Sequence, residues 1–91
     1  MLIRSQNKEL LVNFNVSAGI EIEERNTKTV VTSYITGCSY LLGEYSTKAK
    51  AMKVLDMIQE AYERYEYEKV FKTGLTLLET FHMPEDSEVE V

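Results

Sequence analysis

The stretch STKAKAMKVLDMIQEAYERYEY, residues 46–67, decides the fold because its apolar side chains recur at steps of three and four residues. This spacing gathers them into one stripe on a helix of 3.6 residues per turn. The stripe consists of Ala51, Val54, Leu55, Ile58, Ala61, Tyr62 and Tyr65. A helix with a single apolar stripe needs a partner surface, which the rest of the chain must supply.

The residues before this helix carry strand signals. In GIEIEE, residues 19–24, isoleucines alternate with glutamates, which is the two-residue period of a strand with one wet face. Apolar, β-branched or aromatic runs separated by short polar links indicate further strands at residues 2–5, 9–14, 29–36 and 39–45. Such short links suit antiparallel neighbours.

The residues after Tyr67 are compatible with a continued helix or with a strand broken near Gly74, and we favour a last strand near 75–83. The expected fold is therefore α+β, an antiparallel meander of about five to six strands packed on one amphipathic helix at about 46–67. We expect one domain over residues 1–84.

Residues 85–91, which follow Pro84, form a separate acidic segment. Four carboxylates lie in it, and leaving them aside brings the net charge from −5 to −1. Because so much like charge accompanies so little apolar area, we expect a mobile tail that packs poorly. Residues 1–84 are therefore nearly neutral and lack the positive charge that nucleic-acid binding requires, so we do not expect nucleic acid as a partner.

The chain lacks the marks of export or membrane insertion. It has one cysteine, no signal-like apolar core at its start, and no apolar run near the roughly 20 residues that cross a bilayer. These features predict a cytoplasmic protein with no membrane partner.

The sequence carries no catalytic motif. Cys38 and His82 are the only thiol and the only imidazole, and neither stands beside an orienting base. One His and one Cys cannot build a zinc site, and the scattered glycines form no phosphate loop. We expect a protein without catalytic residues, metal or cofactor.

The start of the helix is a candidate anion site. Ser46, Thr47, Lys48 and Lys50 combine hydroxyls and ammonium groups with the free amides of a first helical turn. Lysines here oppose the helix dipole at a cost of only a few tenths of a kcal/mol each. The site therefore competes with a plainer interpretation, a solvated basic turn.

The end of the helix is a candidate protein interface. Tyrosines and glutamates gather there, at Tyr62, Glu63, Tyr65, Glu66 and Tyr67. Tyrosine rings suit interfaces because they bring apolar area with a polar tip. Tyr62 and Tyr65 also fit the edge of the core, so both interpretations stay open.

A small sheet with one helix leaves apolar side chains uncovered, among them Met52, Met57 and several within residues 70–83. A second subunit could cover them. We expect a homo-oligomer, and a dimer first.

Three phrases of the chain, MLIRSQNKELLVNFN, LGEYSTKAKAMKVLDMIQEAY and MPEDSEVEV, resemble a set of small uncharacterised proteins of Gram-positive bacteria, their prophages and phages. The resemblance covers nearly the whole chain and brings no activity with it. It implies that the protein works in the host cytoplasm by binding a host component, including components of antiviral defence.

Two mechanisms fit that context. The basic helix start favours sequestration of a cyclic or other nucleotide signal, which is the leading hypothesis from sequence. The acidic, tyrosine-rich surface favours an inhibitor or adaptor that occludes a host protein. A structural homo-oligomer without any ligand is the third possibility.

Overall fold

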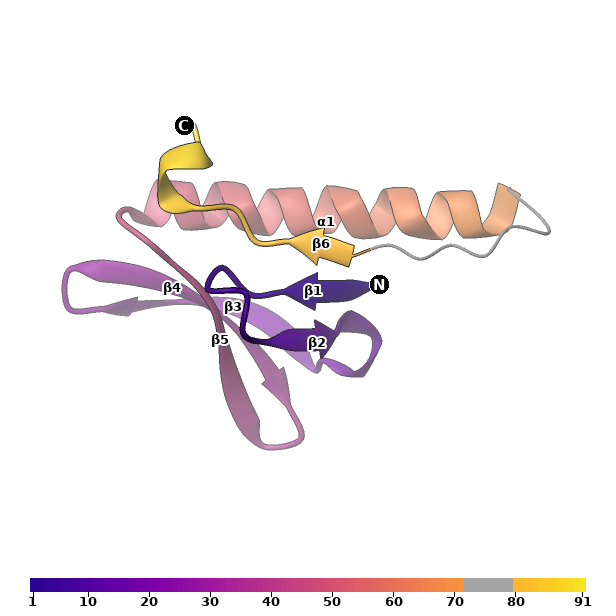
Figure 1. Ribbon diagram of the computed structural model, residues 1–91, viewed down its shortest axis with the longest axis horizontal. Helices are drawn as coiled ribbons and strands as arrows, with labels where there is room; N and C mark the ends of the chain where they lie inside the picture. Colours follow the sequence, from indigo (N-terminus) through magenta and orange to yellow (C-terminus); the bar gives the residue numbers. More distant parts are fainter. Residues whose placement is uncertain (72–79) are drawn as a thin grey trace.

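The computed structural model describes residues 1–71 and 80–91, which form six strands, one long helix and two short 3-10 helices (Figure 1). In chain order these are β1 Leu2–Arg4, β2 Leu11–Asn13, η1 Phe14–Val16, β3 Gly19–Arg25, β4 Lys28–Ile35, β5 Cys38–Tyr45, α1 Lys48–Phe71, β6 Thr80–His82 and η2 Asp86–Glu88. The predicted α+β class and strand number are confirmed. Over the described residues, no helix is long and apolar enough to cross a membrane.

The strands form two small sheets rather than one continuous meander. β3, β4 and β5 make the predicted antiparallel meander, with two-residue turns between paired strand ends. The second sheet has the order β2-β1-β6, in which β1 pairs antiparallel with β2 and parallel with β6. The parallel pair departs from the expected all-antiparallel pairing. In the sequence α1 separates β6 from the other strands, so no tight hairpin fixes the direction of β6.

The helix lies where its apolar stripe predicts. Thr47 is its N-cap, since its Oγ1 accepts from the Lys50 N–H at 3.2 Å, and α1 runs past Tyr67 to Phe71. β6 falls within the predicted last strand at 75–83. The part of that prediction on residues 72–79 lies outside the described residues.

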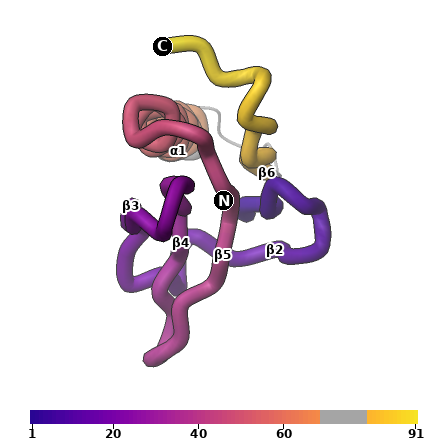
Figure 2. Tube along the Cα trace, turned by 90° about the vertical axis from the view of Figure 1, so that its left-hand side faces the viewer, coloured from indigo at the N-terminus to yellow at the C-terminus, as the bar shows by residue number. Residues whose placement is uncertain are grey.

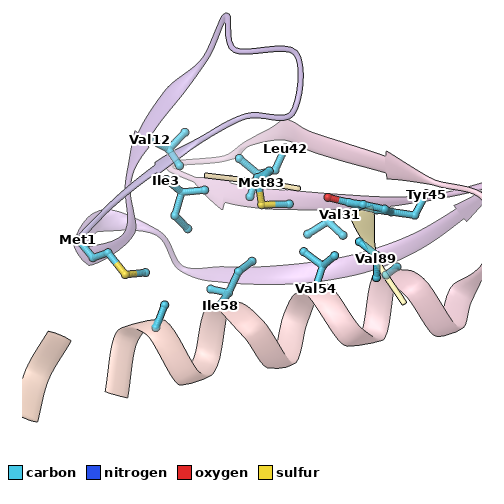
Figure 3. Packing of buried hydrophobic residues seen from close by; sticks show 12 residues of the cluster. Met1, Ile3, Val12, Val31, Leu42, Tyr45, Val54, Ile58, Met83 and Val89 are labelled. Atoms are coloured by element: carbon cyan, nitrogen blue, oxygen red, sulfur yellow. The ribbon is translucent and has the colours of Figure 1, made fainter. Parts of the chain in front are cut away.

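The core forms where both sheets, α1 and the C-terminal segment meet (Figure 3). Its side chains come from both sheets, from the chain ends and from α1, where they recur at helical spacing. They are Met1, Ile3, Val12, Val31, Leu42, Tyr45, Ala51, Val54, Ile58, Ala61, Met83 and Val89.

Gln6 ties the two sheets together. Its N–H donates to the Leu42 carbonyl at 2.7 Å, and its side-chain Oε1 accepts from the Glu44 N–H at 2.9 Å. The same side chain's Nε2 donates to the carbonyls of Glu44 and Pro84, both at 3.1 Å. Gln6, two residues after the end of β1, therefore joins the edge of β5 to the C-terminal segment.

The prediction that residues 85–91 pack poorly is wrong. Val89 is only 5% exposed and belongs to the core, and η2 lies beside the first turns of α1 (Figures 1 and 2). Glu85 and Glu88 form a reciprocal capping box around η2. The segment packs because Val89 is buried in the core and because Asp86 binds the Ser46 amide and Lys50 at the start of α1.

Candidate functional site

At the start of α1, two of the four residues of the predicted anion site, Ser46 and Lys50, contact a carboxylate of the chain itself. The Ser46 N–H donates to Asp86 Oδ1 at 2.8 Å. Lys50 Nζ donates to the Asp86 carbonyl at 3.0 Å and lies 3.4 Å from Asp86 Oδ2. Thr47 caps the helix, while Lys48 is exposed.

Asp86 takes the place that an external anion would need. The Ser46 amide, and then Lys50, hold the pKa of the Asp86 carboxyl below its usual value, so Asp86 is ionised at neutral pH. A phosphate would have to displace this carboxylate from the Ser46 amide and the Lys50 ammonium.

The cavity beside this turn is also unfavourable to an anion. It encloses about 340 Å³ and is lined by Gln6, Thr27, Lys28, Glu44, Tyr45, Ser46, Glu85 and Asp86. Its one ammonium, on Lys28, is 3.4 Å from Glu44. Burial raises the pKa of Tyr45, and the nearby carboxylates of the C-terminal segment raise it further. The cavity wall therefore carries a negative field.

The second half of α1 carries a different arrangement. The Tyr62 ring packs against Phe14 of η1, with ring centroids 4.7 Å apart and planes tilted by 37°. A hydrogen bond with the Glu66 carboxylate, one turn along the helix, raises the pKa of the Tyr62 hydroxyl. Both side chains are half-buried. Two rings and one carboxylate are thus held together at the surface.

These side chains border a shallow hollow of about 440 Å³ between η1 and α1, which we term the aromatic hollow. Its lining residues are Phe14, Asn15, Ser17, Tyr62 and Glu66. Aromatic faces and a carboxylate are the groups that attract an ammonium or a guanidinium. The hollow is suited to a basic side chain.

Local sequence fixes the η1 side of the aromatic hollow. Asn13 caps η1, since its Oδ1 accepts from the Asn15 N–H at 3.0 Å. The Ser17 hydroxyl donates to the Gly19 carbonyl at 2.9 Å and lies 2.9 Å from the Ser33 hydroxyl of β4. Phe14 is therefore presented to Tyr62 by a short, capped turn between β2 and β3.

The five predicted interface residues divide into three groups. Tyr62 and Glu66 line the aromatic hollow. Tyr62 and Tyr65 both pack against the core, as the alternative interpretation allowed. Tyr67 is 64% exposed, and Glu63 is exposed and accepts from Gln59 at 3.0 Å.

Four contributing residues were not foreseen: Phe14, Asn15, Ser17 and Asp86. The opposite charges of residues 85–88 and of the helix start are the signal that could have indicated Asp86. No comparable signal exists for Phe14, because its contact with Tyr62 joins residues far apart in the sequence.

The thiol and the imidazole lie apart in the fold. Cys38 is exposed at the first residue of β5, and His82 is exposed at the last residue of β6, in the other sheet.

Comparison with known protein families, with curated proteins and with solved structures finds no match for this chain.

Proposed function

We propose that this is a non-catalytic binding protein that occludes a basic segment of a partner protein, with the aromatic hollow as its anchor. The carrying observation is the Glu66 carboxylate held beside the Phe14–Tyr62 ring pair in an open hollow. An ammonium or guanidinium there meets ring faces and a carboxylate together. Cation–π contacts contribute about 0.5–2 kcal/mol, depending on how far they are desolvated.

The charge of the molecule supports this choice of partner. The net charge is −5, and Glu63 adds an exposed carboxylate near the aromatic hollow on α1. A negative surface accelerates the approach of a basic partner and disfavours an acidic one. Acidic residues thus guide the encounter, and the hollow holds the bound side chain.

The resemblance to phage-borne proteins supplies the biological setting of the proposal. In that setting the partner is a host protein, and occluding it is a means of countering host defence. The exposed Tyr67 extends the same helix surface with a further aromatic contact.

Sequestration of a nucleotide at Ser46, Thr47, Lys48 and Lys50 is the less supported alternative, because Asp86 already engages the Ser46 amide and Lys50. It predicts that cyclic nucleotides raise the melting temperature, and raise it more in Asp86→Asn than in the wild type. No shift with any nucleotide in either protein would dismiss it.

The experiment that tests occlusion is affinity capture of partner proteins from host lysate with the tagged full-length chain. Glu66→Lys places an ammonium in the hollow and should abolish capture of the specific partner. Glu60→Lys is the matched control, because it makes the same charge change at an exposed position of the same helix. An empty capture, or equal loss in both variants, would contradict the proposal.

A further inference from the structure

We propose that the outer edge of β3 accepts a strand from the partner protein, and that this strand alternates basic with apolar residues. The inference rests on the proposed function in one respect, that the partner is a protein. It adds a second contact and a conformation for the bound segment, namely extended and paired with β3 as an extra strand of the meander.

β3 has a free edge in the described part of the chain. In the order β3-β4-β5 it is an outer strand, and it pairs only with β4. No backbone hydrogen bond joins Gly19–Arg25 to any other described segment. At seven residues, β3 is also long enough to support several cross-strand bonds.

The two faces of β3 differ in chemistry, and this difference selects the incoming strand. Ile20 and Ile22 are half-buried and pack against the core. Glu21 and Glu23 are exposed and, by the two-residue period, lie on the opposite face together with Arg25, whose guanidinium is 3.1 Å from the Glu23 carboxylate. A strand beside β3 therefore needs apolar residues next to the isoleucines and basic residues next to the glutamates.

A second copy of this chain does not fit this edge. Pairing β3 with another β3 would bring carboxylates of both copies together on one face, and like charges across strands are destabilising. The acidic edge thus disfavours self-association while it favours Lys or Arg on a partner. The same charges explain why an uncovered strand of this length is tolerated in the monomer.

The free edge continues into the aromatic hollow along the chain. Ser17 lines the hollow and lies two residues before Gly19, where β3 begins. A basic segment can therefore pair with β3 and place a further basic side chain near Glu66. This continuity makes the hollow and the edge parts of one acidic docking surface.

The test is a titration of the ¹⁵N-labelled full-length protein with a capped decapeptide that alternates lysine and valine. We expect amide shifts and slowed amide exchange along residues 20–25. Glu21→Lys/Glu23→Lys should weaken binding by about tenfold or more, because two attractive cross-strand pairs become repulsive. Glu9→Lys/Glu90→Lys, which makes the same charge change at exposed positions elsewhere, should bind like the wild type.

A lysine–proline decapeptide separates strand pairing from simple charge attraction, since it has the same charge but cannot form the ladder. We expect it to leave the β3 amides unshifted. If both peptides shift only residues of the aromatic hollow, the edge proposal is overturned while the proposed function stands. If neither peptide binds, the edge proposal also fails, and capture from lysate then decides the proposed function separately.

Discussion

Thr36 adopts a backbone conformation that its side chain disfavours. It has φ 48°, followed by Gly37 with φ 83°, and the two residues form the turn that joins Ile35 of β4 to Cys38 of β5. Positive φ at both central positions is typical of the type I′ turn, whose twist matches that of the flanking strands. Gly37 adopts it freely, whereas a β-branched threonine is strained there.

Replacing Thr36 by asparagine should therefore stabilise the protein. Asn tolerates positive φ, so we expect the free energy of unfolding to rise by about 0.5–1 kcal/mol. Urea denaturation measures it. Thr27→Asn, in the β3–β4 turn where Thr27 has no positive φ, is the control and should change stability little. Equal effects of both changes would show that strain at Thr36 is not the cause.

Asp86 makes stability depend on pH in a defined direction. The pKa of its carboxyl is lowered in the folded state by the Ser46 amide and by Lys50, so the folded protein binds this proton less readily than the unfolded chain. Its contribution is therefore complete above the usual carboxyl pKa near 4 and is lost as the pH falls through the lower folded value.

Asp86→Asn should remove that part of the acid sensitivity. The variant should be less stable than the wild type at pH 7, and the difference should shrink on acidification below pH 4. Melting temperatures of both proteins between pH 7 and pH 2 measure this. A difference that does not change with pH would show that the Asp86 charge is not what holds the C-terminal segment.

At the scale of elements, local signals made the helix and the meander predictable. The stripe through Val54 and Ile58 belongs to one helix, and the alternation at Ile20 and Ile22 belongs to one strand. The parallel pairing of β1 with β6 could not be predicted, since it joins the two ends of the chain. The packing of residues 85–91 was not predicted, because the negative charges of this segment were counted without considering that Lys50 would pair with Asp86.

In the candidate site too, residues of a single element could be predicted from sequence, whereas contacts between elements could not. Tyr62 and Glu66 could be named from sequence because tyrosines and glutamates gather at the end of one helix. Phe14 could not, because its position against Tyr62 depends on how η1 packs against α1. A hollow between two elements is a product of packing, and a single sequence contains no local signal for it.

Substitution of Gln6 tests how much its hydrogen bonds between the two sheets contribute to stability. Gln6→Ala removes three side-chain hydrogen bonds, two to Glu44 and one to Pro84. We expect a loss of about 1–3 kcal/mol in unfolding free energy, because three hydrogen bonds of about 0.5–1.5 kcal/mol each are removed and the one to Pro84 is partly buried. Gln59→Ala, which removes one exposed bond on α1, is the control in the same urea titration and should cost little.

Val89 tests whether the C-terminal segment is part of the fold. Val89→Ala removes two buried methyl groups and should lower the unfolding free energy by about 1–2 kcal/mol. Val91→Ala, at a position that is 77% exposed, should leave it unchanged. Differential scanning calorimetry compares them. If the two variants melt together, the core does not extend to this segment.

At the scale of the whole molecule, charge is distributed unevenly. At the helix start Asp86 engages the Ser46 amide and Lys50, whereas the glutamates of β3 and two glutamates of α1, Glu60 and Glu63, are exposed. The acidic surface left open for partners therefore lies along β3 and the far half of the helix. This distribution is why a basic protein segment fits the molecule better than a phosphate does.

Homodimer formation stays a prediction, and the exposed apolar side chains indicate where to test it. Met57 is half-buried beside Val89, and Met52 is 44% exposed. Leu2 and Leu11 are 37% and 50% exposed, and the register of β1 with β2 puts both on the outer face of their sheet. A second subunit that covers this face would bury two leucines at once.

Leu11→Lys should therefore convert a dimer into a monomer. Its effect on monomer stability should be small, because half of the side chain is already in water. Native mass spectrometry and sedimentation at several protein concentrations measure the change, and Val91→Lys is the control for the added charge. A wild-type chain that stays monomeric at every concentration would contradict the dimer, and a dimer that persists in Leu11→Lys would move its interface to the Met52 side of the helix.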